Sequence, residues 1–273
     1  MSRSSLPTLL VLAACIVFCA PCAARAASNA QDAMRACPRI RYSTNPHYPP
    51  YDWITAQGAF EGASIDLLKL AAPKGVELVP VVTPWKRAMY LAQKGGIDLL
   101  VSLRIRPERS EYLEFTTHRA FPNPIVVFAR KAGGFAFRSW DDLEGRKGGI
   151  SLGDTFGNGF DEYWHEHLRI DEAADMDSNF RKLAAGHIDY FVTGLYVGEA
   201  YLATHDLGQP IVALSPPISD QDIYFGFSRR SPCAAWVGEF SRNLERLDEQ
   251  GIPERLLQKH LRRFQEHSVK LPE

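Results

Sequence analysis

The chain has 273 residues, of which 45% are hydrophobic and 23% charged, with 18 Pro and 20 Gly. These values are ordinary for a globular protein of one or two domains, and they exclude a disordered, collagen-like or coiled-coil chain. The 31 Lys and Arg residues nearly balance the 32 Asp and Glu residues, for a formal charge of −1. This balance does not favour nucleic acid or an anionic membrane as a partner, so a small-molecule ligand is expected.

The N-terminus has the pattern of a secretory signal peptide. Arg3 precedes an apolar run over residues 9–20 and a small-residue stretch over residues 23–27. Cleavage is expected after Ala26, so residues 1–26 are the predicted signal peptide and the mature protein is exported. The alternative is a lipoprotein box ending at Cys15, which would be acylated. The apolar residues after Cys15 favour a continuing signal core instead.

Cleavage leaves two cysteines, Cys37 and Cys233. In an oxidising compartment an even pair predicts a disulfide, and the loop-entropy model credits so long a loop with about 5 kcal/mol. Two buried free thiols are the alternative.

Short β-rich runs alternate with amphipathic helices along the mature chain. Strands are expected over residues 40–44, 76–82, 97–103, 125–129, 149–152, 188–193 and 223–227. Helices are expected over residues 64–72, 85–94, 160–168, 178–186 and 195–205, and two more over residues 236–247 and 256–264. The rhythm breaks near residues 130–134 and 216–217. Two α/β units joined by two breaks predict two lobes.

Five short motifs follow one another along this pattern. They are Tyr48-Pro49-Pro50-Tyr51-Asp52, Gly95-Gly96-Ile97-Asp98, Arg106-Pro107-Glu108-Arg109-Ser110, Trp140-Asp141-Asp142-Leu143-Glu144-Gly145-Arg146 and Gly186-His187-Ile188-Asp189. Each motif is weak alone. Their order and spacing together resemble the periplasmic solute-binding proteins of the polar amino acid type, the family 3 receptors of ABC importers, over nearly the whole mature chain.

The resemblance implies an α/β, two-lobed periplasmic binding protein fold of type II. Lobe one would comprise residues 27–130 and 221–273, and lobe two residues 131–220, with crossovers near residues 129–133 and 217–223. The ligand would lie in the cleft between the lobes. The resemblance also implies a periplasmic monomer, without cofactor or metal, that delivers a small-molecule ligand to a membrane permease. Both remaining cysteines would then belong to lobe one.

In lobe one, the resemblance makes Arg109 the expected partner of a ligand carboxylate, which a planar guanidinium binds in bidentate fashion. A surface arginine is the alternative. Ser102 and Arg104 lie at or near positions where the family uses small hydroxyl residues. The segment from Asp98 to Arg109 is one residue shorter than the family pattern, so their register stays open. If Arg104 faces the cleft, the ligand is expected to carry a second anionic group.

Tyr48, Tyr51 and Trp85 are the expected aromatic walls of the cleft, although Trp85 could equally belong to a core face of its helix. In lobe two, residues 153–157 lie between a strand and a helix, where free backbone N–H groups can receive a carboxylate. Asp154 and Thr155 are candidate ligand contacts there. Asp154 could instead cap the helix.

Gly194 occupies the place where the resembled amino-acid receptors keep an acid for the α-ammonium group. A glycine cannot supply that charge, so the usual anchor is in doubt. Asp154 could replace the acid, and Tyr196 is a nearby candidate for a polar contact.

A binding protein is preferred over an enzyme. The G-x-S-x-G pattern places Ser151 inside an expected strand, and His165 and His167 point to different sides of a helix, which argues against a hydrolase and a metal site. The main alternative is an enzyme of the cyclohexadienyl dehydratase kind, which shares the fold and needs an acid/base group such as Asp154. A ligand-sensing partner of a membrane receptor is a third possibility. The sequence does not identify the ligand.

Overall fold

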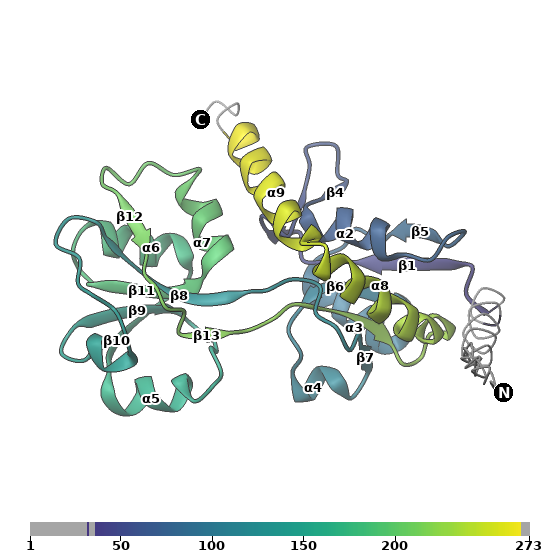
Figure 1. The fold of residues 1–273 in the computed structure, drawn as a ribbon, viewed down its shortest axis with the longest axis horizontal. Coiled ribbons are helices and arrows are strands. Elements are labelled where there is room, and N and C mark those ends of the chain that lie inside the picture. The colour runs from purple at the N-terminus through teal and green to yellow at the C-terminus, as the bar shows by residue number, and fades with distance from the viewer. Residues whose placement is uncertain (1–31, 33–35, 269–273) are drawn as a thin grey trace, which may run out of the picture.

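The computed structural model describes residue 32 and residues 36–268. The chain forms two α/β lobes joined by two extended segments (Figure 1). The expected signal peptide and the alternative lipid site at Cys15 lie outside the described residues.

Lobe one is built on a five-stranded sheet with the order β5-β1-β6-β14-β7. Its strands are β1 (Arg39–Ser43), β5 (Glu77–Pro80), β6 (Leu99–Leu103), β7 (Leu113–Phe115) and β14 (Tyr224–Ser228). Strand β1 runs parallel to β5 and β6, whereas β14 is antiparallel to β6 and β7. Every residue of β6 is buried, as expected for a central strand that is covered on both faces.

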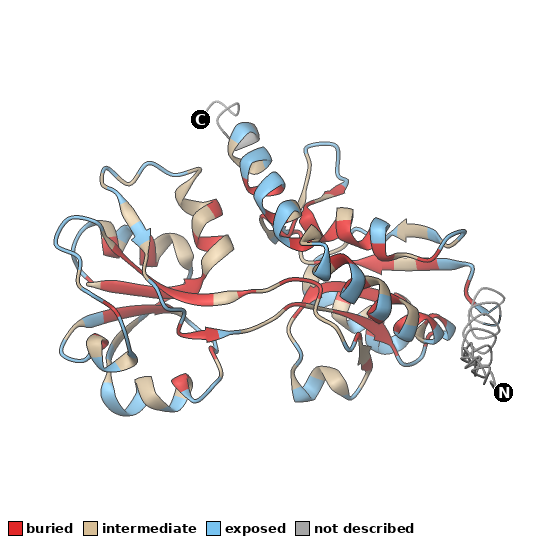
Figure 2. Cartoon of the chain, viewed as in Figure 1, coloured by how far each residue is buried: buried red, intermediate tan, exposed pale blue. Residues whose placement is uncertain are grey.

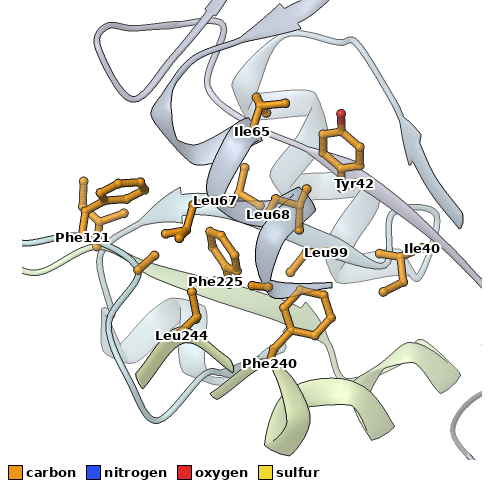
Figure 3. Packing of buried hydrophobic residues seen from close by; sticks show 14 of the residues in the cluster. Ile40, Tyr42, Ile65, Leu67, Leu68, Leu99, Phe121, Phe225, Phe240 and Leu244 are labelled. Atoms are coloured by element: carbon orange, nitrogen blue, oxygen red, sulfur yellow. The ribbon is translucent and has the colours of Figure 1, made fainter. Parts of the chain in front are cut away.

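The other elements of lobe one cover this sheet or extend from it. The helices are α2 (Ala63–Ala71), α3 (Trp85–Lys94), α4 (Pro107–Ser110), η2 (Pro232–Trp236), α8 (Val237–Glu249) and α9 (Ile252–Ser268), and a small sheet contains β2 (His47–Tyr48), β3 (Asp52–Ile54) and β4 (Phe60–Glu61). Helix α3 has the predicted bounds and ends at Gly95 in the left-handed conformation. Figure 3 shows Leu67, Leu99, Phe225 and Phe240 in the core between helices and sheet.

Lobe two has a six-stranded sheet with the order β10-β9-β11-β8-β12, and β13 also pairs with β8. Its strands are β8 (Pro124–Arg130), β9 (Lys147–Ser151), β10 (Arg169–Ala173), β11 (Tyr190–Gly194), β12 (Ile211–Ala213) and β13 (Ser219–Asp220). Its helices are η1 (Trp140–Leu143), α5 (Phe160–His167), α6 (Met176–Ala184) and α7 (Leu195–Leu202). Buried residues follow the strands of both lobes, and exposed residues lie on the outer faces of the helices (Figure 2).

The expected first crossover near residues 129–133 is wrong. Strand β8 pairs with β11 from Ile125 to Ala129, so residues 124–130 belong to the sheet of lobe two. The connecting segments are residues 116–123 and 221–223, which pair with each other through a bridge between Phe121 and Ile223. An apolar run predicts a buried strand but does not indicate which sheet contains it.

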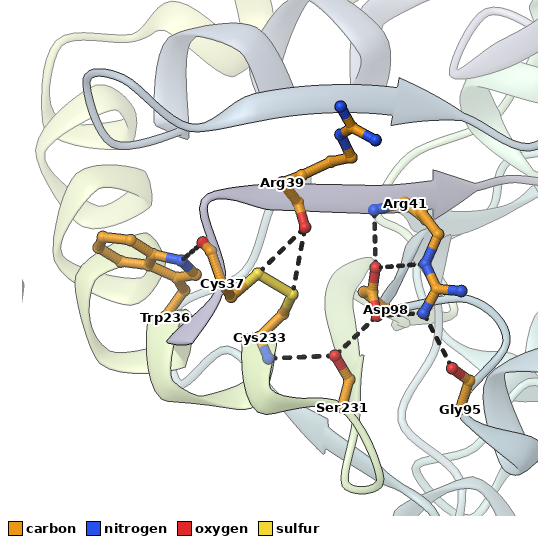
Figure 4. The surroundings of a disulfide bond; sticks show 8 residues. All are labelled: Cys37, Arg39, Arg41, Gly95, Asp98, Ser231, Cys233 and Trp236. Atoms are coloured by element: carbon orange, nitrogen blue, oxygen red, sulfur yellow. Dashed lines mark hydrogen bonds and ion pairs between the residues drawn. A yellow bond between two sulfur atoms is a disulfide. The ribbon is translucent and has the colours of Figure 1, made fainter. Parts of the chain in front are cut away.

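The predicted disulfide between Cys37 and Cys233 is confirmed, with a Cα–Cα distance of 5.1 Å (Figure 4). Cys37 lies just before β1 and Cys233 lies in η2, and both are buried. The indole Nε1 of Trp236 donates a hydrogen bond to the carbonyl of Cys37 at 2.9 Å. The disulfide therefore links the start of the lobe-one sheet to the segment that leads into the C-terminal helices.

Candidate ligand-binding cleft

Most of the predicted side chains lie at or after the carboxyl ends of parallel strands. Ser102 lies in β6 and Arg104 follows it, while Thr155 comes shortly after β9 and Tyr196 after β11. Open α/β sheets bind ligands at this end of their strands. The two lobes meet there, because Arg104 and Arg106 of lobe one both reach Thr155 of lobe two.

A cavity of about 120 Å³ lies on the lobe-one side of this junction. Its lining brings together the predicted residues Tyr48, Trp85, Ser102, Arg104 and Arg109, with Asn45, Leu103, Arg106 and Ile223. A larger hollow of about 660 Å³ is lined by the single segment 202–211 of lobe two. That hollow lies away from the strand ends, so we place the candidate site in the smaller cavity.

Three arginines meet neutral oxygen atoms around this cavity. Arg104 Nη1 donates to the carbonyl of Thr155 at 2.8 Å, and Arg106 Nη2 donates to the hydroxyl of Thr155 at 3.2 Å. Arg109 Nη1 donates to the carbonyl of Arg104 at 3.0 Å. Burial lowers the pKa of Arg109, and the nearby charges of Arg106 and Arg104 lower it further. Ser102 and Arg104, whose register the sequence left open, both line the cavity.

Trp85 fits both interpretations of its position. It begins α3, is half-buried, packs against the apolar cluster between α3 and β6, and also lines the cavity. Tyr48 lines the cavity as well, and burial raises the pKa of its phenol while the charge of Arg104 opposes that rise.

Tyr51 lies behind Tyr48 and outside the lining of this cavity. It is fully buried, its ring stacks on Tyr48 with 5.1 Å between centroids, and its hydroxyl donates to the carbonyl of Pro122 at 3.0 Å. The ring of Tyr196 lies edge-on to the ring of Tyr51, with 6.1 Å between their centroids, and packs against the core of lobe one. These two tyrosines therefore join the lobes and the first crossover segment.

Residues 153–157 do not form the expected anion site at a helix N-terminus. Helix α5 begins at Phe160 with Gly159 as its N-cap, so Asp154 does not cap it. The backbone N–H groups of Phe156 and Gly157 already donate to the carboxylate of Asp161, at 2.9 and 2.7 Å. The side chain of Asp161 in α5 thus satisfies two of the backbone donors that we expected to be available to a ligand.

Asp154 is the acid that approaches the arginines from lobe two. Its side chain is solvent-exposed, yet the surrounding protein raises its pKa, while the charges of Arg104 and Arg106 act in the opposite direction. Asp154 therefore lies near Arg104 and Arg106 but is not among the residues that line the cavity.

Asp52, which belongs to the first sequence motif but was not among the predicted ligand contacts, is a fully buried acid in β3. Both of its carboxyl oxygens lack a hydrogen-bond partner, and burial raises its pKa to about 7, although the hydroxyls of Ser102, Thr44 and Ser64 lie close enough to oppose the rise. Ser102 adopts φ +59, which is uncommon for a residue with a side chain, and its hydroxyl is hydrogen-bonded to that of Ser64. Ser102 thus lines the cavity and also lies within reach of Asp52.

Gly194 ends β11 and supplies no acid to the cleft. A Cβ atom at this position would lie 3.1 Å from Oδ1 of Asn123 and 3.2 Å from Cγ2 of Val197. A larger residue would therefore require these neighbours to move.

Two α/β lobes that face each other across parallel-strand ends are the architecture of the type II periplasmic binding protein fold. Among residues 32 and 36–268, no helix combines the length and apolar character needed to cross a membrane. The family model of bacterial extracellular solute-binding proteins, family 3, matches residues 40–262. The chain belongs to this family.

Curated relatives include binding proteins and one enzyme. The histidine-binding periplasmic protein of Salmonella typhimurium is 27% identical over 72% of this chain and 76% of its own length. The ABC transporter arginine-binding protein 1 of Escherichia coli is 27% identical over 56% of this chain and 62% of its own length. The cyclohexadienyl dehydratase of Pseudomonas aeruginosa is 24% identical over 44% of this chain and 46% of its own length.

Solved structures support the same fold. The probable amino-acid ABC transporter extracellular-binding protein ytmK of Bacillus subtilis has a TM-score of 0.70 at 14% identity, covering 82% of this chain and 97% of that one. An ancestral cationic amino acid solute-binding protein has a TM-score of 0.65 at 22% identity, covering 86% and 99%.

Proposed function

We propose that this protein is a periplasmic solute-binding protein that captures a small polar, carboxylate-bearing solute and delivers it to the permease of an ABC importer. The observation that carries the proposal is the cavity at the strand ends, where Arg109 lies beside Ser102 and Trp85. A guanidinium held by a backbone carbonyl is suited to bind a carboxylate, and an aromatic ring offers an apolar wall.

The connection between the lobes supports capture by closure. Two paired segments, residues 116–123 and 221–223, join the lobes, and a pair of such connections is typical of hinge closure around a ligand. The relatives named for histidine and arginine binding indicate amino acids or related compounds as the first solutes to test.

The enzyme alternative rests on the more distant dehydratase relative. An enzyme would need an acid/base group within reach of the substrate. The lining of the cavity contains no carboxylate, and neither Asp154 nor Asp52 is among its lining residues. A binding role therefore has the stronger support.

A thermal-shift screen of the exported protein against amino acids, small peptides and carboxylates tests the proposal. We expect stabilisation by at least one carboxylate-bearing solute, together with a change in tryptophan fluorescence from Trp85. Prephenate and arogenate are assayed in parallel for turnover. Turnover of either compound, or stabilisation by none of the carboxylates, would contradict the proposed function.

Export is tested separately. We expect an intact mass that begins at Ala27, because the apolar run and the small residues around Ala26 predict cleavage there. A diacylglyceryl adduct on Cys15 would show a membrane-anchored lipoprotein instead.

A further inference from the structure

Resting on the proposed function, we propose that the cleft selects a solute with two anionic groups, a dicarboxylate, which Arg109 binds at one end and Arg104 with Arg106 at the other. All three arginines line the cavity, and its lining contains no acidic residue.

The charges of these arginines are compensated only in part, by Asp154 near Arg104 and Arg106 and by Glu108 near Arg109. Within the described part of the chain, no ion pair includes Arg104 or Arg109, and Arg106 has Glu108 at 4.0 Å, with the carboxylate largely exposed. The lowered pKa of Arg109 reflects burial and the crowding of like charges. An anionic ligand would relieve this crowding, and two anionic groups would relieve it more than one.

The arginines also have hydrogen-bonding capacity to spare. A guanidinium has five N–H donors. Arg106 and Arg109 each use one donor, on the hydroxyl of Thr155 and on the carbonyl of Arg104. Arg104 bonds the carbonyl of Thr155 and the phenol of Tyr48. Each side chain is therefore held by a neutral partner while most of its donors remain available for carboxylate oxygens.

The cleft is less suited to an α-ammonium group than to a second carboxylate. Gly194 supplies no acid, and the carboxylate of Asp154 lies close to Arg104 and Arg106. Because Asp154 is exposed, solvent screens its repulsion of an incoming anion. A dicarboxylate without an ammonium group is thus the simplest occupant, and succinate and glutarate are suitable probes.

Calorimetry with matched pairs of probes tests the inference. Succinate is compared with succinamate and glutarate with glutaramate, since each amide keeps the size of the molecule and removes one charge. We expect at least one dicarboxylate to bind about 10- to 100-fold more tightly than its amide, the range for a charge-assisted hydrogen-bond pair. Inorganic phosphate is titrated separately, because it carries its charge in one compact group rather than at two ends of a chain.

Variants assign the second anion site. In Arg104→Gln/Arg106→Gln we expect the preference for the dicarboxylate over its amide to disappear, while the amide itself binds as before. The control is Arg39→Gln, at an exposed arginine paired with Glu77 in lobe one, which should preserve the preference.

Several outcomes would overturn the inference. If the arginines only bridge the lobes, the double variant weakens dicarboxylate and amide equally. Tighter binding of a neutral or cationic amino acid than of any dicarboxylate would refute the dianion but leave the proposed function intact. Tighter binding of phosphate than of any dicarboxylate would refute a dicarboxylate as the selected solute. Failure of every probe in this panel would also overturn it, whereas the wider carboxylate screen decides the proposed function.

Discussion

The guanidinium of Arg109 is already oriented by the carbonyl of Arg104, 3.0 Å from its Nη1. A preorganised fork loses little conformational freedom when it binds a carboxylate. We expect Arg109→Ala to weaken binding of the tightest carboxylate in the screen by about 100-fold, the upper range for a charged hydrogen-bond partner. Arg109→Lys should recover little, because an ammonium group cannot form two parallel bonds. Calorimetry on both variants measures this, and unchanged affinity in Arg109→Ala would move the anchor to Arg104.

Asp52 predicts a dependence of stability on pH. Its pKa rises from the usual 3.8 to about 7 in the folded protein, so the folded state binds the proton more tightly than the unfolded state. The group's contribution to the free energy of unfolding is therefore greatest below about pH 4 and is lost as the pH rises to about 7. A rise of this size corresponds to about 4 kcal/mol.

We expect Asp52→Asn to flatten the dependence between pH 4 and pH 7 and to make the protein more stable than the wild type at pH 8. Urea unfolding at pH 5 and pH 8 provides the measurement. Asp206→Asn, at an exposed acid, is the matched control and should leave the difference between the two pH values unchanged. An Asp52→Asn variant with the pH profile of the wild type would mean that Asp52 stays ionised throughout.

The sequence motifs located several cleft residues but not their surroundings. Arg109, Ser102 and Trp85 line one cavity, because motif order fixes their places in or after particular strands. The burial of Asp52 could not be predicted, since an acid in an aromatic-proline loop is usually exposed. Likewise, no pattern indicated that Asp161 would occupy the loop donors before α5.

At the scale of elements, the entry into α2 depends on a close backbone approach. Gly62 has φ +139, and a Cβ atom there would lie 2.8 Å from Cα of Asp52 and nearer still to the carbonyl of Tyr51. We expect Gly62→Ala to destabilise the protein by about 3 kcal/mol or more, because backbone atoms must shift.

Gly58→Ala is the control for this prediction. Gly58 also has positive φ, +78, but a Cβ atom there meets nothing within 4 Å, so only the backbone conformation is strained. We expect a loss of about 1 kcal/mol in urea unfolding. Equal losses in the two variants would show that the contact with residues 51 and 52 is not the cause.

Periodicity predicted the long elements better than the short ones. Helix α3 has the expected bounds because its apolar spacing and Gly95 agree on where it ends. The strands β2, β3 and β4 have only two or three residues each, too few for an alternating pattern. Strand β8 was recognised but assigned to the wrong lobe, because sheet membership depends on long-range pairing.

For the whole molecule, the disulfide should contribute to stability without affecting the cleft. It lies before β1, at the opposite end of the strand from the cavity. We expect Cys37→Ala/Cys233→Ala to lower the free energy of unfolding by up to about 5 kcal/mol in the loop-entropy model, with ligand affinity retained. Urea unfolding and calorimetry measure the two quantities. A changed affinity would show that the bond also controls the cleft.

The Cys37–Cys233 bond also turns most of the chain into a covalent ring. All strands of lobe two lie in residues 124–220, between the two cysteines in the sequence. In lobe one, β1 follows Cys37 and β14 precedes Cys233, so the disulfide joins the chain next to these two strands. A protease that cuts one peptide bond in an exposed loop of lobe two would open the ring without releasing a fragment. Such a nicked protein would separate into two pieces on a denaturing gel only after reduction. The disulfide would keep β1 and β14 of lobe one in the same molecule.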